Sequence, residues 1–116
     1  DLLPKADLRV GNMLELPWPD KSFDCTLIDA VLMYISPSEI DIAMREIDRV
    51  TKKGVLIVDR FKDSIKGELA GYVWGRNYPE IMNVLGFTVS AKFLTSKLWP
   101  DSPNWAKYGI VVSAVR

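Results

Sequence analysis

A strand–helix–strand unit within residues 23–58 constrains the fold of this chain more than any other feature. Residues 23–30 form a largely apolar run, which is typical of a strand buried on both faces of a parallel sheet. Residues 55–58 are apolar and mostly β-branched, and they predict a second buried strand. Two such strands joined by a helix form a right-handed crossover, so the sequence predicts an α/β fold.

The connecting helix is marked at both ends. Ser36 can cap it, Pro37 suits the first helical position, and Glu39 completes a capping box. Gly54 suits the left-handed residue that follows a helix. Between these signals, apolar residues recur at helical spacing and predict one buried stripe, made of Ile40, Ala43, Met44, Ile47 and Val50.

The rest of the chain predicts shorter elements. Residues 8–10 are expected to form a strand, and residues 64–75 a flap or an irregular helix. A second helix begins at Asn77 and ends at Gly86. The chain then ends in an antiparallel strand pair, residues 88–94 and 108–115, joined by a long aromatic connection over residues 95–107.

Composition limits the chemistry available to the chain. Its 116 residues suit one domain, and its 15 basic and 15 acidic residues leave no electrostatic footprint for nucleic acid. The absence of histidine excludes histidine bases and histidine-bearing zinc sites, and we expect no metal site. Cys25 lies in an apolar run and is expected to be a buried structural thiol. No apolar run approaches the ~20 residues of a membrane span and no signal peptide is visible, so the expected location is cytoplasmic.

Polar residues follow three predicted strands at their carboxyl ends. They are Asn12-Met13, Asp29-Ala30 and Asp59-Arg60. Ligands of an open α/β sheet bind outside these ends, near the switch in strand order. Each residue alone could merely cap or turn the chain, whereas the ordered set is a coherent hypothesis for a ligand site.

Four short motifs give the chain a family resemblance. They are Gly11-Asn12-Met13, Leu16-Pro17-Trp18-Pro19, Phe23-Asp24 and Arg45-Glu46-Ile47-Asp48-Arg49-Val50. In this order they resemble the second half of a class I S-adenosylmethionine (SAM) dependent methyltransferase, in the broad group that acts on small molecules. The resemblance implies a Rossmann-like sheet of order 3-2-1-4-5-7-6, SAM as the cofactor and a small-molecule acceptor.

The resemblance covers almost all of residues 1–116 but only about the last half of the family domain. The family's first two strands and its Gly-x-Gly-x-Gly loop have no counterpart, and none of the seven glycines forms Gly-x-Gly. We therefore expect a single partial domain with a truncated sheet. Its strand at residues 23–30 keeps an open edge, so we expect a homodimer or a missing N-terminal half that completes the fold.

The resemblance also implies roles for residues at the strand ends. Asn12 stands where the family usually has an aspartate that binds the adenine amino group, and its amide oxygen could accept the same hydrogen bond. Met13 belongs either to the adenine face or to the core. Asp29 and Ala30 match the strand end beside the methionine moiety of SAM, where backbone carbonyls and the Asp29 carboxylate could hold the ammonium group.

Methyl transfer from a sulfonium needs little acid–base machinery, because the positive sulfur already activates the methyl group. If a base is needed, the candidates are Asp29, Tyr34 and Asp59. Tyr34 replaces a position that is often histidine, and it faces either the substrate or the core. The Asn/Asp-Pro-Pro-Tyr motif of amino-group methylation on nucleobases or glutamine is missing, which argues against those acceptors.

Other residues are expected to support this site. Asp24 is a structural acid in the look-alikes, and Arg45, Glu46 and Arg49 are expected to form a solvated helix face with weak ion pairs. Six of the aromatic residues after the third core strand lie where the family builds its acceptor pocket. They could shape an apolar or planar acceptor site or belong to the core and to interfaces: Tyr72, Trp74, Tyr78, Trp99, Trp105 and Tyr108.

Two functions are therefore carried forward. The first is methyl transfer from SAM to an unidentified small-molecule acceptor, by a chain expected to be inactive as an isolated fragment. The alternative is a non-catalytic methyltransferase-like module that binds a partner or dimerises through its open sheet edge. Another nucleotide-binding doubly wound fold is a weaker third possibility, because Lys53-Gly54 and the Leu16-Pro17 loop fit it less well.

Overall fold

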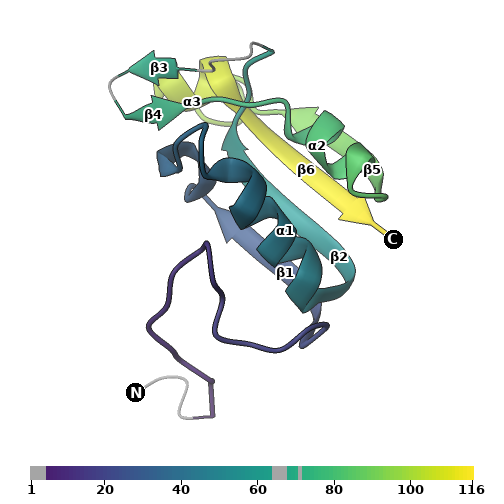
Figure 1. Cartoon of the computed structure of the whole chain (residues 1–116). Helices are drawn as coiled ribbons and strands as arrows, with labels where there is room; N and C mark the ends of the chain where they lie inside the picture. Colours follow the sequence, from purple (N-terminus) through teal and green to yellow (C-terminus); the bar gives the residue numbers. More distant parts are fainter. Residues whose placement is uncertain (1–4, 64–67, 71) are drawn as a thin grey trace.

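The computed structural model describes residues 5–63, 68–70 and 72–116. A four-stranded sheet forms its centre, in the order β1–β2–β6–β5 (Figure 1). Strands β1 (Phe23–Asp29) and β2 (Thr51–Arg60) are parallel, whereas β6 (Gly109–Val115) runs antiparallel to both β2 and β5 (Thr88–Phe93). This order is that of the carboxyl half of the expected sheet. The predicted truncated α/β fold and its final antiparallel strand pair are therefore confirmed.

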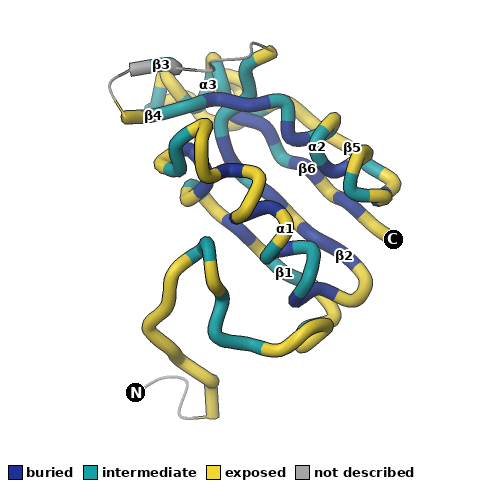
Figure 2. The backbone as a smooth tube through the Cα atoms, viewed as in Figure 1, coloured by how far each residue is buried: buried dark blue, intermediate teal, exposed yellow. Residues whose placement is uncertain are grey.

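The two longer helices, α1 (Ile40–Val50) and α2 (Tyr78–Val84), cover the same face of this sheet (Figure 1). The predicted apolar stripe of α1 is confirmed, because all five of its residues are buried. Met82 of α2 is buried in the same cluster, together with Ile57 of β2 and Ile110 of β6. The core thus lies between the helices and the central strand pair, as the buried segments of Figure 2 show.

The opposite face of the sheet is open in the part of the chain that the structure describes. Leu27, Leu56 and Val115 are exposed by 65%, 40% and 52%, because side chains alternate between the two faces of a strand. A shallow hollow of about 380 Å³ runs along this face, lined by Cys25, Thr26, Leu27, Gly54, Val55, Leu56, Ser113, Ala114 and Val115. The expected burial of residues 23–30 on both faces is wrong, since both helices pack on one side. Cys25 is exposed on the open face, where it lines this hollow, so the expected burial of its thiol is wrong. Asp24 is exposed as well, beside the register shift between Phe23 and Cys25.

The predicted capping box of α1 does not form. The hydroxyl of Ser36 lies 3.0 Å from that of Ser38, and the N-cap residue of α1 is Glu39, whose side chain makes no capping bond. A turn over residues 37–39 precedes the helix, and the Ile40 amide donates to the Ser36 carbonyl at 3.1 Å. The helix therefore begins three residues later than predicted, and backbone bonds hold its entry.

The predicted end of α1 is also wrong. The helix ends at Val50, and β2 begins at Thr51 with no residue between them. The Thr51 hydroxyl donates to the Ile47 carbonyl at 2.6 Å and lies 2.6 Å from the Thr26 hydroxyl. Gly54 belongs to β2, where an added Cβ would lie 3.2 Å from the Ala114 carbonyl oxygen. Glycine is therefore needed there for close strand packing and not for a left-handed turn.

The second helix has its predicted start and end. The Asn77 side chain accepts a 3.1 Å hydrogen bond from the Glu80 amide, and Gly86 has a φ of 96°. Of the segment 64–75, residues 64–67 and 71 lie outside the described residues. The remainder forms a two-stranded sheet and not the expected flap or irregular helix, with strands β3 (Glu68–Ala70) and β4 (Val73–Trp74).

Two short helices are absent from the sequence-based prediction. A 3-10 helix, η1 (Leu32–Tyr34), follows β1, and α3 (Pro103–Tyr108) interrupts the expected hairpin connection. The N-cap position of α3 is Ser102, so a Ser-Pro pair opens this helix. The connection between β5 and β6 is therefore partly helical.

The strand expected at residues 8–10 does not form. This segment is exposed and lies within the long N-terminal loop that runs away from the sheet (Figures 1 and 2). A strand requires a neighbour for its backbone groups, and none of the described segments pairs with it. Instead, Arg9 forms an ion pair with Asp7 at 2.9 Å and donates to the Pro17 carbonyl, which closes the loop on itself.

Candidate functional site

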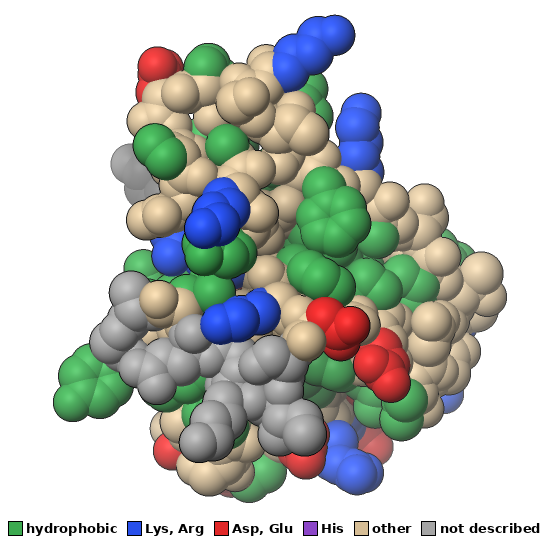
Figure 3. All heavy atoms as spheres, turned by 90° about the horizontal axis from the view of Figure 1, so that it is seen from above, with side chains coloured by type: hydrophobic (Ala, Val, Ile, Leu, Met, Phe, Trp, Pro, Cys, Tyr) green, Lys and Arg blue, Asp and Glu red, His purple; other side chains and the backbone are tan. Residues whose placement is uncertain are grey.

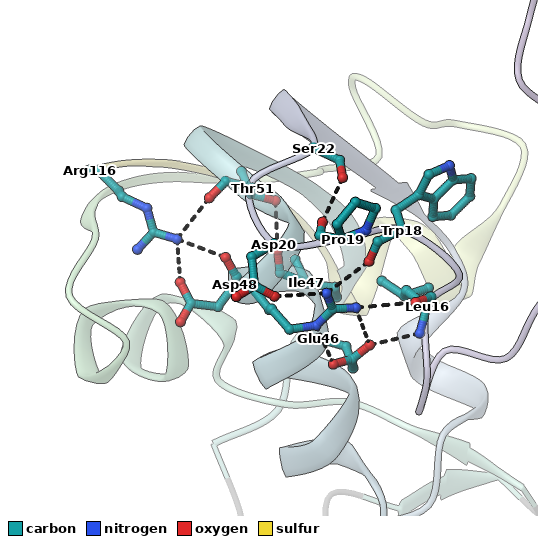
Figure 4. A network of polar contacts seen from close by, with 11 residues as sticks. Leu16, Trp18, Pro19, Asp20, Ser22, Glu46, Ile47, Asp48, Thr51 and Arg116 are labelled. Carbon is teal, nitrogen blue, oxygen red and sulfur yellow. Dashed lines mark hydrogen bonds and ion pairs between the residues drawn. The ribbon is translucent and has the colours of Figure 1, made fainter.

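The loop that contains the Leu16-Pro17-Trp18-Pro19 motif is fastened to α1. Arg49 donates to the carbonyl oxygens of Trp18 and Leu16 at 2.8 and 3.1 Å and to the Asp20 carboxylate at 3.0 Å. Glu46 accepts from the Leu16 amide at 2.7 Å and pairs with Arg49 at 2.7 Å (Figure 4). The Arg49 hydrogen bond is the main reason that the pKa of Glu46 falls to about 2. The expected solvated face of weak ion pairs is thus a partly buried clamp.

This clamp holds the loop near a hollow that contains several of the predicted site residues. The hollow has a volume of about 410 Å³ and is lined by Asn12, Met13, Leu14, Tyr34, Ile35, Ser36, Glu39, Tyr72 and Trp74. Two predicted cofactor residues, one candidate base and two predicted acceptor-pocket aromatics therefore meet in one place. The lining comes from the N-terminal loop, the segment around η1 and the β3–β4 hairpin.

Asn12 forms a turn at the rim of this hollow. Its side-chain oxygen accepts a 2.9 Å hydrogen bond from the Leu14 amide, and its carbonyl accepts from the Glu15 amide at 3.0 Å. The resemblance assigns this side-chain oxygen to the adenine amino group, but the oxygen already accepts one hydrogen bond within the protein. An amide oxygen has two lone pairs, so one acceptor position of Asn12 remains.

Asp29 and Ala30 lie at the carboxyl end of β1 and outside this hollow. Asp29 is exposed and lines a second hollow of about 200 Å³, which shares Met13 with the first. Ala30 has a φ of 56°, and its amide donates to the Val58 carbonyl at 2.8 Å. A left-handed alanine costs roughly 1–2 kcal/mol, and such strained residues cluster at functional sites.

Asp59, the third candidate base, is fully buried. One of its carboxylate oxygens accepts from the Arg60 amide at 2.7 Å, and the other has no hydrogen-bond partner among the described residues. Burial raises the pKa of Asp59 to about 6, against the opposing effects of the backbone amides of Arg60, Met33 and Leu32 and of the Arg76 charge. Asp59 therefore cannot contact a ligand in the larger hollow, whereas Asp29 and Tyr34 are both exposed.

Arg76 is the residue near this site that the sequence analysis missed. Its guanidinium is buried and donates to the Leu32 carbonyl at 2.8 Å and to the Ile35 carbonyl. The neighbouring Tyr78 is fully buried, and burial raises the pKa of its hydroxyl. A cation inside the aromatic run Tyr72–Tyr78 is the sequence signal that could have pointed to Arg76.

The six predicted acceptor-pocket aromatics do not form one site. Tyr72 and Trp74 line the larger hollow, whereas Tyr78 lies in the core. Trp99 and Trp105 pair with each other at a ring distance of 6.2 Å, outside the lining of this hollow. Figure 3 shows hydrophobic side chains interspersed with Lys and Arg on this end of the molecule. The candidate acceptor surface thus narrows to the two aromatics of the 72–74 segment and Tyr34.

The sequence match coincides with the first crossover of the sheet. Residues 2–58 match the family described as a methyltransferase domain. The matched range includes the N-terminal loop, which carries Asn12 and Met13, followed by β1, α1 and most of β2. Asp29 and Ala30 lie at the carboxyl end of β1. Over the matched range, just under half of its residues, the chain is similar to the methyltransferase family that its four motifs resemble.

Solved structures share the fold of this chain. The structure titled [4+2]-cyclase SpnF has a TM-score of 0.69 at 20% identity, over 95% of this chain and 55% of that one. A protein from Pyrococcus horikoshii has a TM-score of 0.68 at 16% identity, over 96% and 59%. A SAM-dependent methyltransferase from Methanosarcina mazei has a TM-score of 0.66 at 19% identity, over 97% and 68%. No curated protein matches the sequence.

These comparisons support the methyltransferase fold and SAM as the family's cofactor. The chain spans only 55% and 59% of the lengths of the first two structures, and one of them is titled a cyclase, so the fold alone does not fix a reaction. None of the helices in the described residues has the length and hydropathy of a membrane span. The chain's described acidic and cysteine side chains form no cluster suited to a metal ion.

Proposed function

We propose that this chain supplies the carboxyl half of a SAM site and part of an acceptor pocket for methyl transfer to a small molecule. The observation that carries this proposal is the convergence of Asn12 and Met13 with Tyr34, Tyr72 and Trp74 on one hollow of about 410 Å³. Residues that the resemblance assigns to the cofactor and residues that it assigns to the acceptor thus face the same space.

In this proposal the N-terminal loop binds the adenine and the end of β1 binds the methionine moiety of SAM. The free acceptor position of Asn12 receives the adenine amino group, and Met13 packs against the adenine ring. Asp29 and the left-handed Ala30 lie toward the methionine moiety, reached through the second hollow that shares Met13. An exposed carboxylate can hold the ammonium group of that moiety by a charge-assisted hydrogen bond.

Methyl transfer requires mainly that the acceptor atom and the methyl group of SAM are aligned. The acceptor atom forms a bond to the methyl carbon while the carbon–sulfur bond breaks, and its electron pair leaves on sulfur. The pocket contributes by fixing the two reactants and excluding water. Tyr34, Tyr72 and Trp74 suit an apolar or planar acceptor. Asp29 and Tyr34 are the exposed groups that could take a proton from it.

The decisive experiment is a calorimetric titration of this 116-residue chain with S-adenosylhomocysteine. Asn12→Ala tests the site, and Asn83→Ala is its matched control, because Asn83 is exposed on α2 and lines none of the hollows described here. Binding that only Asn12→Ala weakens supports the proposal. Equal affinities in the two variants would place the ligand elsewhere and reject the role of Asn12.

The open side of the sheet suggests how the site is completed. β1 pairs only with β2 among the described strands, and the face opposite α1 and α2 is uncovered. We propose that an N-terminal half of the methyltransferase domain, or a second copy of the chain, covers this region, and that the isolated chain is inactive without it. Methyl transfer by the isolated chain at the rate of a complete enzyme would contradict this part of the proposal.

The open edge of β1 also favours a second candidate function. In it, the chain is a non-catalytic methyltransferase-like module that binds a partner or dimerises through that edge. Sedimentation equilibrium and the same titration separate the two functions. A dimer that does not bind S-adenosylhomocysteine supports the module, whereas binding that depends on Asn12 supports the enzyme.

A further inference from the structure

Two carbonyl groups at the ends of one short turn share a buried cation. Arg76 donates from one guanidinium nitrogen to the Leu32 carbonyl at 2.8 Å and from another to the Ile35 carbonyl. The same two residues close the turn, because the Ile35 amide donates to the Leu32 carbonyl at 3.0 Å. The Arg76 side chain therefore spans η1 from its first residue to the residue that ends it.

Asp59, at the end of β2, is fully buried near this turn, and the amides of Leu32 and Met33 and the charge of Arg76 act to lower the pKa of its carboxyl. Its own hydrogen bond, however, comes from the Arg60 amide at 2.7 Å, and its other oxygen has no partner among the described residues. Arg76 is therefore the charged side chain whose hydrogen bonds hold the turn.

The Arg76 side chain does not line the hollow, but the turn that it holds does. Tyr34, Ile35 and Ser36 all belong to its lining, and neither Arg76 nor Asp59 does. Tyr34 is 62% exposed, so its own packing does little to fix it. A three-residue 3-10 turn has weak hydrogen-bond geometry by itself, so its position depends on the bonds made to it from outside.

We propose that Arg76 is a positioning residue that fixes η1 and thereby determines where Tyr34 stands in the hollow. Its importance for methyl transfer rests on the proposed function, whereas the fixing of the turn does not. Hydrogen bonds from a buried charged group are stronger than neutral ones, which suits Arg76 to hold a site residue in place. A loose turn would let Tyr34 sample several positions beside the hollow.

Amide hydrogen exchange of the full 116-residue chain tests this inference residue by residue. In Arg76→Met we expect the exchange of the Tyr34 and Ile35 amides to rise at least tenfold, while the amides of α1 and β6 keep their rates. Arg76→Lys keeps the charge and at least one donor, so an intermediate increase is expected. Arg45→Met is the matched control, because Arg45 is exposed on α1, and it should leave the turn unchanged.

Two results would overturn the inference. One is unchanged exchange at Tyr34 and Ile35 in Arg76→Met, which would show that the turn holds itself. The other is an equal rise in α1, β6 and the turn, which would show that Arg76 supports the whole fold and has no special hold on η1. If Arg76→Met does not fold, Arg76→Lys is judged by the same two criteria.

A titration with S-adenosylhomocysteine separates this inference from the proposed function. If the wild-type chain binds the ligand, and the affinity falls severalfold in Arg76→Lys but not in Arg45→Met, the result supports both the proposed function and the positioning role of Arg76. Wild-type chain that does not bind counts against the proposed function, and the exchange measurement still decides whether Arg76 fixes the turn. Severalfold weaker binding with normal exchange at Tyr34 and Ile35 would reject the positioning role.

Discussion

Arg49 donates a 2.8 Å hydrogen bond to the carbonyl oxygen of Trp18, a residue on the N-terminal loop. The loop has no strand to anchor it, and this contact joins it to the last turn of α1. Two of the motifs that carry the family resemblance, one on the loop and one on the helix, are thus in direct contact. The loop also carries Asn12 and Met13, so the clamp helps to place the candidate cofactor residues.

Arg49→Met is expected to release this loop. The substitution removes the donor to the carbonyls of Trp18 and Leu16 and leaves the Glu46 carboxylate with the Leu16 amide but without its ion pair. We therefore expect the free energy of unfolding to fall by about 1–3 kcal/mol. Urea unfolding measures this change. Arg45→Met, on the exposed side of α1, should change stability by less than about 0.5 kcal/mol, and equal losses in the two variants would contradict the clamp.

The raised pKa of Asp59 predicts a fall in stability as the pH rises. Its pKa increases from 3.8 to about 6 on folding, so between these values the folded chain binds the proton more tightly than the unfolded chain. The stabilisation is complete below about pH 4 and is lost as the pH passes 6, by about 3 kcal/mol at most. The loss of unfolding free energy between pH 4 and pH 7 should be smaller in Asp59→Asn than in the wild type, by up to this amount. An equal loss in the two proteins would show that Asp59 does not have this raised pKa.

Glu46 predicts the opposite trend at lower pH. Its pKa falls from 4.5 to about 2 on folding, chiefly because Arg49 donates to it, so stability is lost as the pH falls from about 4.5 toward 2. Thermal unfolding of wild type and Glu46→Gln over this range measures the effect. The variant should lose less stability on acidification than the wild type. Parallel curves would show that the ion pair with Arg49 contributes nothing.

Ala30→Gly is expected to stabilise the chain. Glycine adopts the φ of 56° found at this position without the steric cost that alanine bears, which outweighs the greater freedom of glycine in the unfolded chain. We expect a gain of about 0.5–1 kcal/mol in urea unfolding. The control, Ala91→Gly within β5, should lose a similar amount, because glycine weakens a strand. A loss in both variants would reject the strain at Ala30.

Cys25 reports on the open face of the sheet. Its exposed thiol should react with Ellman's reagent in the native chain at a rate within about tenfold of that in the unfolded chain. A protein segment that covers the face should slow the reaction. Full protection of the chain at low concentration would show that the face is already covered, whereas protection that grows with concentration indicates a dimer.

Local signals in the sequence predicted the elements that depend on local physics. The apolar stripe of α1 and the Asn77 cap of α2 rely on residues within a few positions of each other, and both formed as predicted. The strand order followed from the family resemblance. The Ser-Pro start of α3 was also a local signal, but the aromatic residues around it favoured a loop interpretation.

The failed predictions involve distant contacts. Gly54 was assigned to a helix end from its neighbours, although the Ala114 carbonyl, from a different strand, determines its role. The burial of Cys25 depends on what covers a whole sheet face, which no local pattern contains. Arg76 donates hydrogen bonds to the carbonyls of Leu32 and Ile35, which lie more than forty residues away in the sequence. Whether Asn12, Met13, Asp29 and Ala30 bind SAM stays a prediction.

No loop residue separates α1 from β2, because the helix ends at Val50 and the strand begins at Thr51. One residue inserted there would either unwind the last helical turn or shift β2 by one position along its neighbours. Such a shift exchanges the two faces of the strand, so that Ile57 and Asp59 would turn toward solvent and Leu56 toward the core. This junction therefore sets which side of the sheet faces inward, and length changes should be tolerated far better in the 95–102 segment than here.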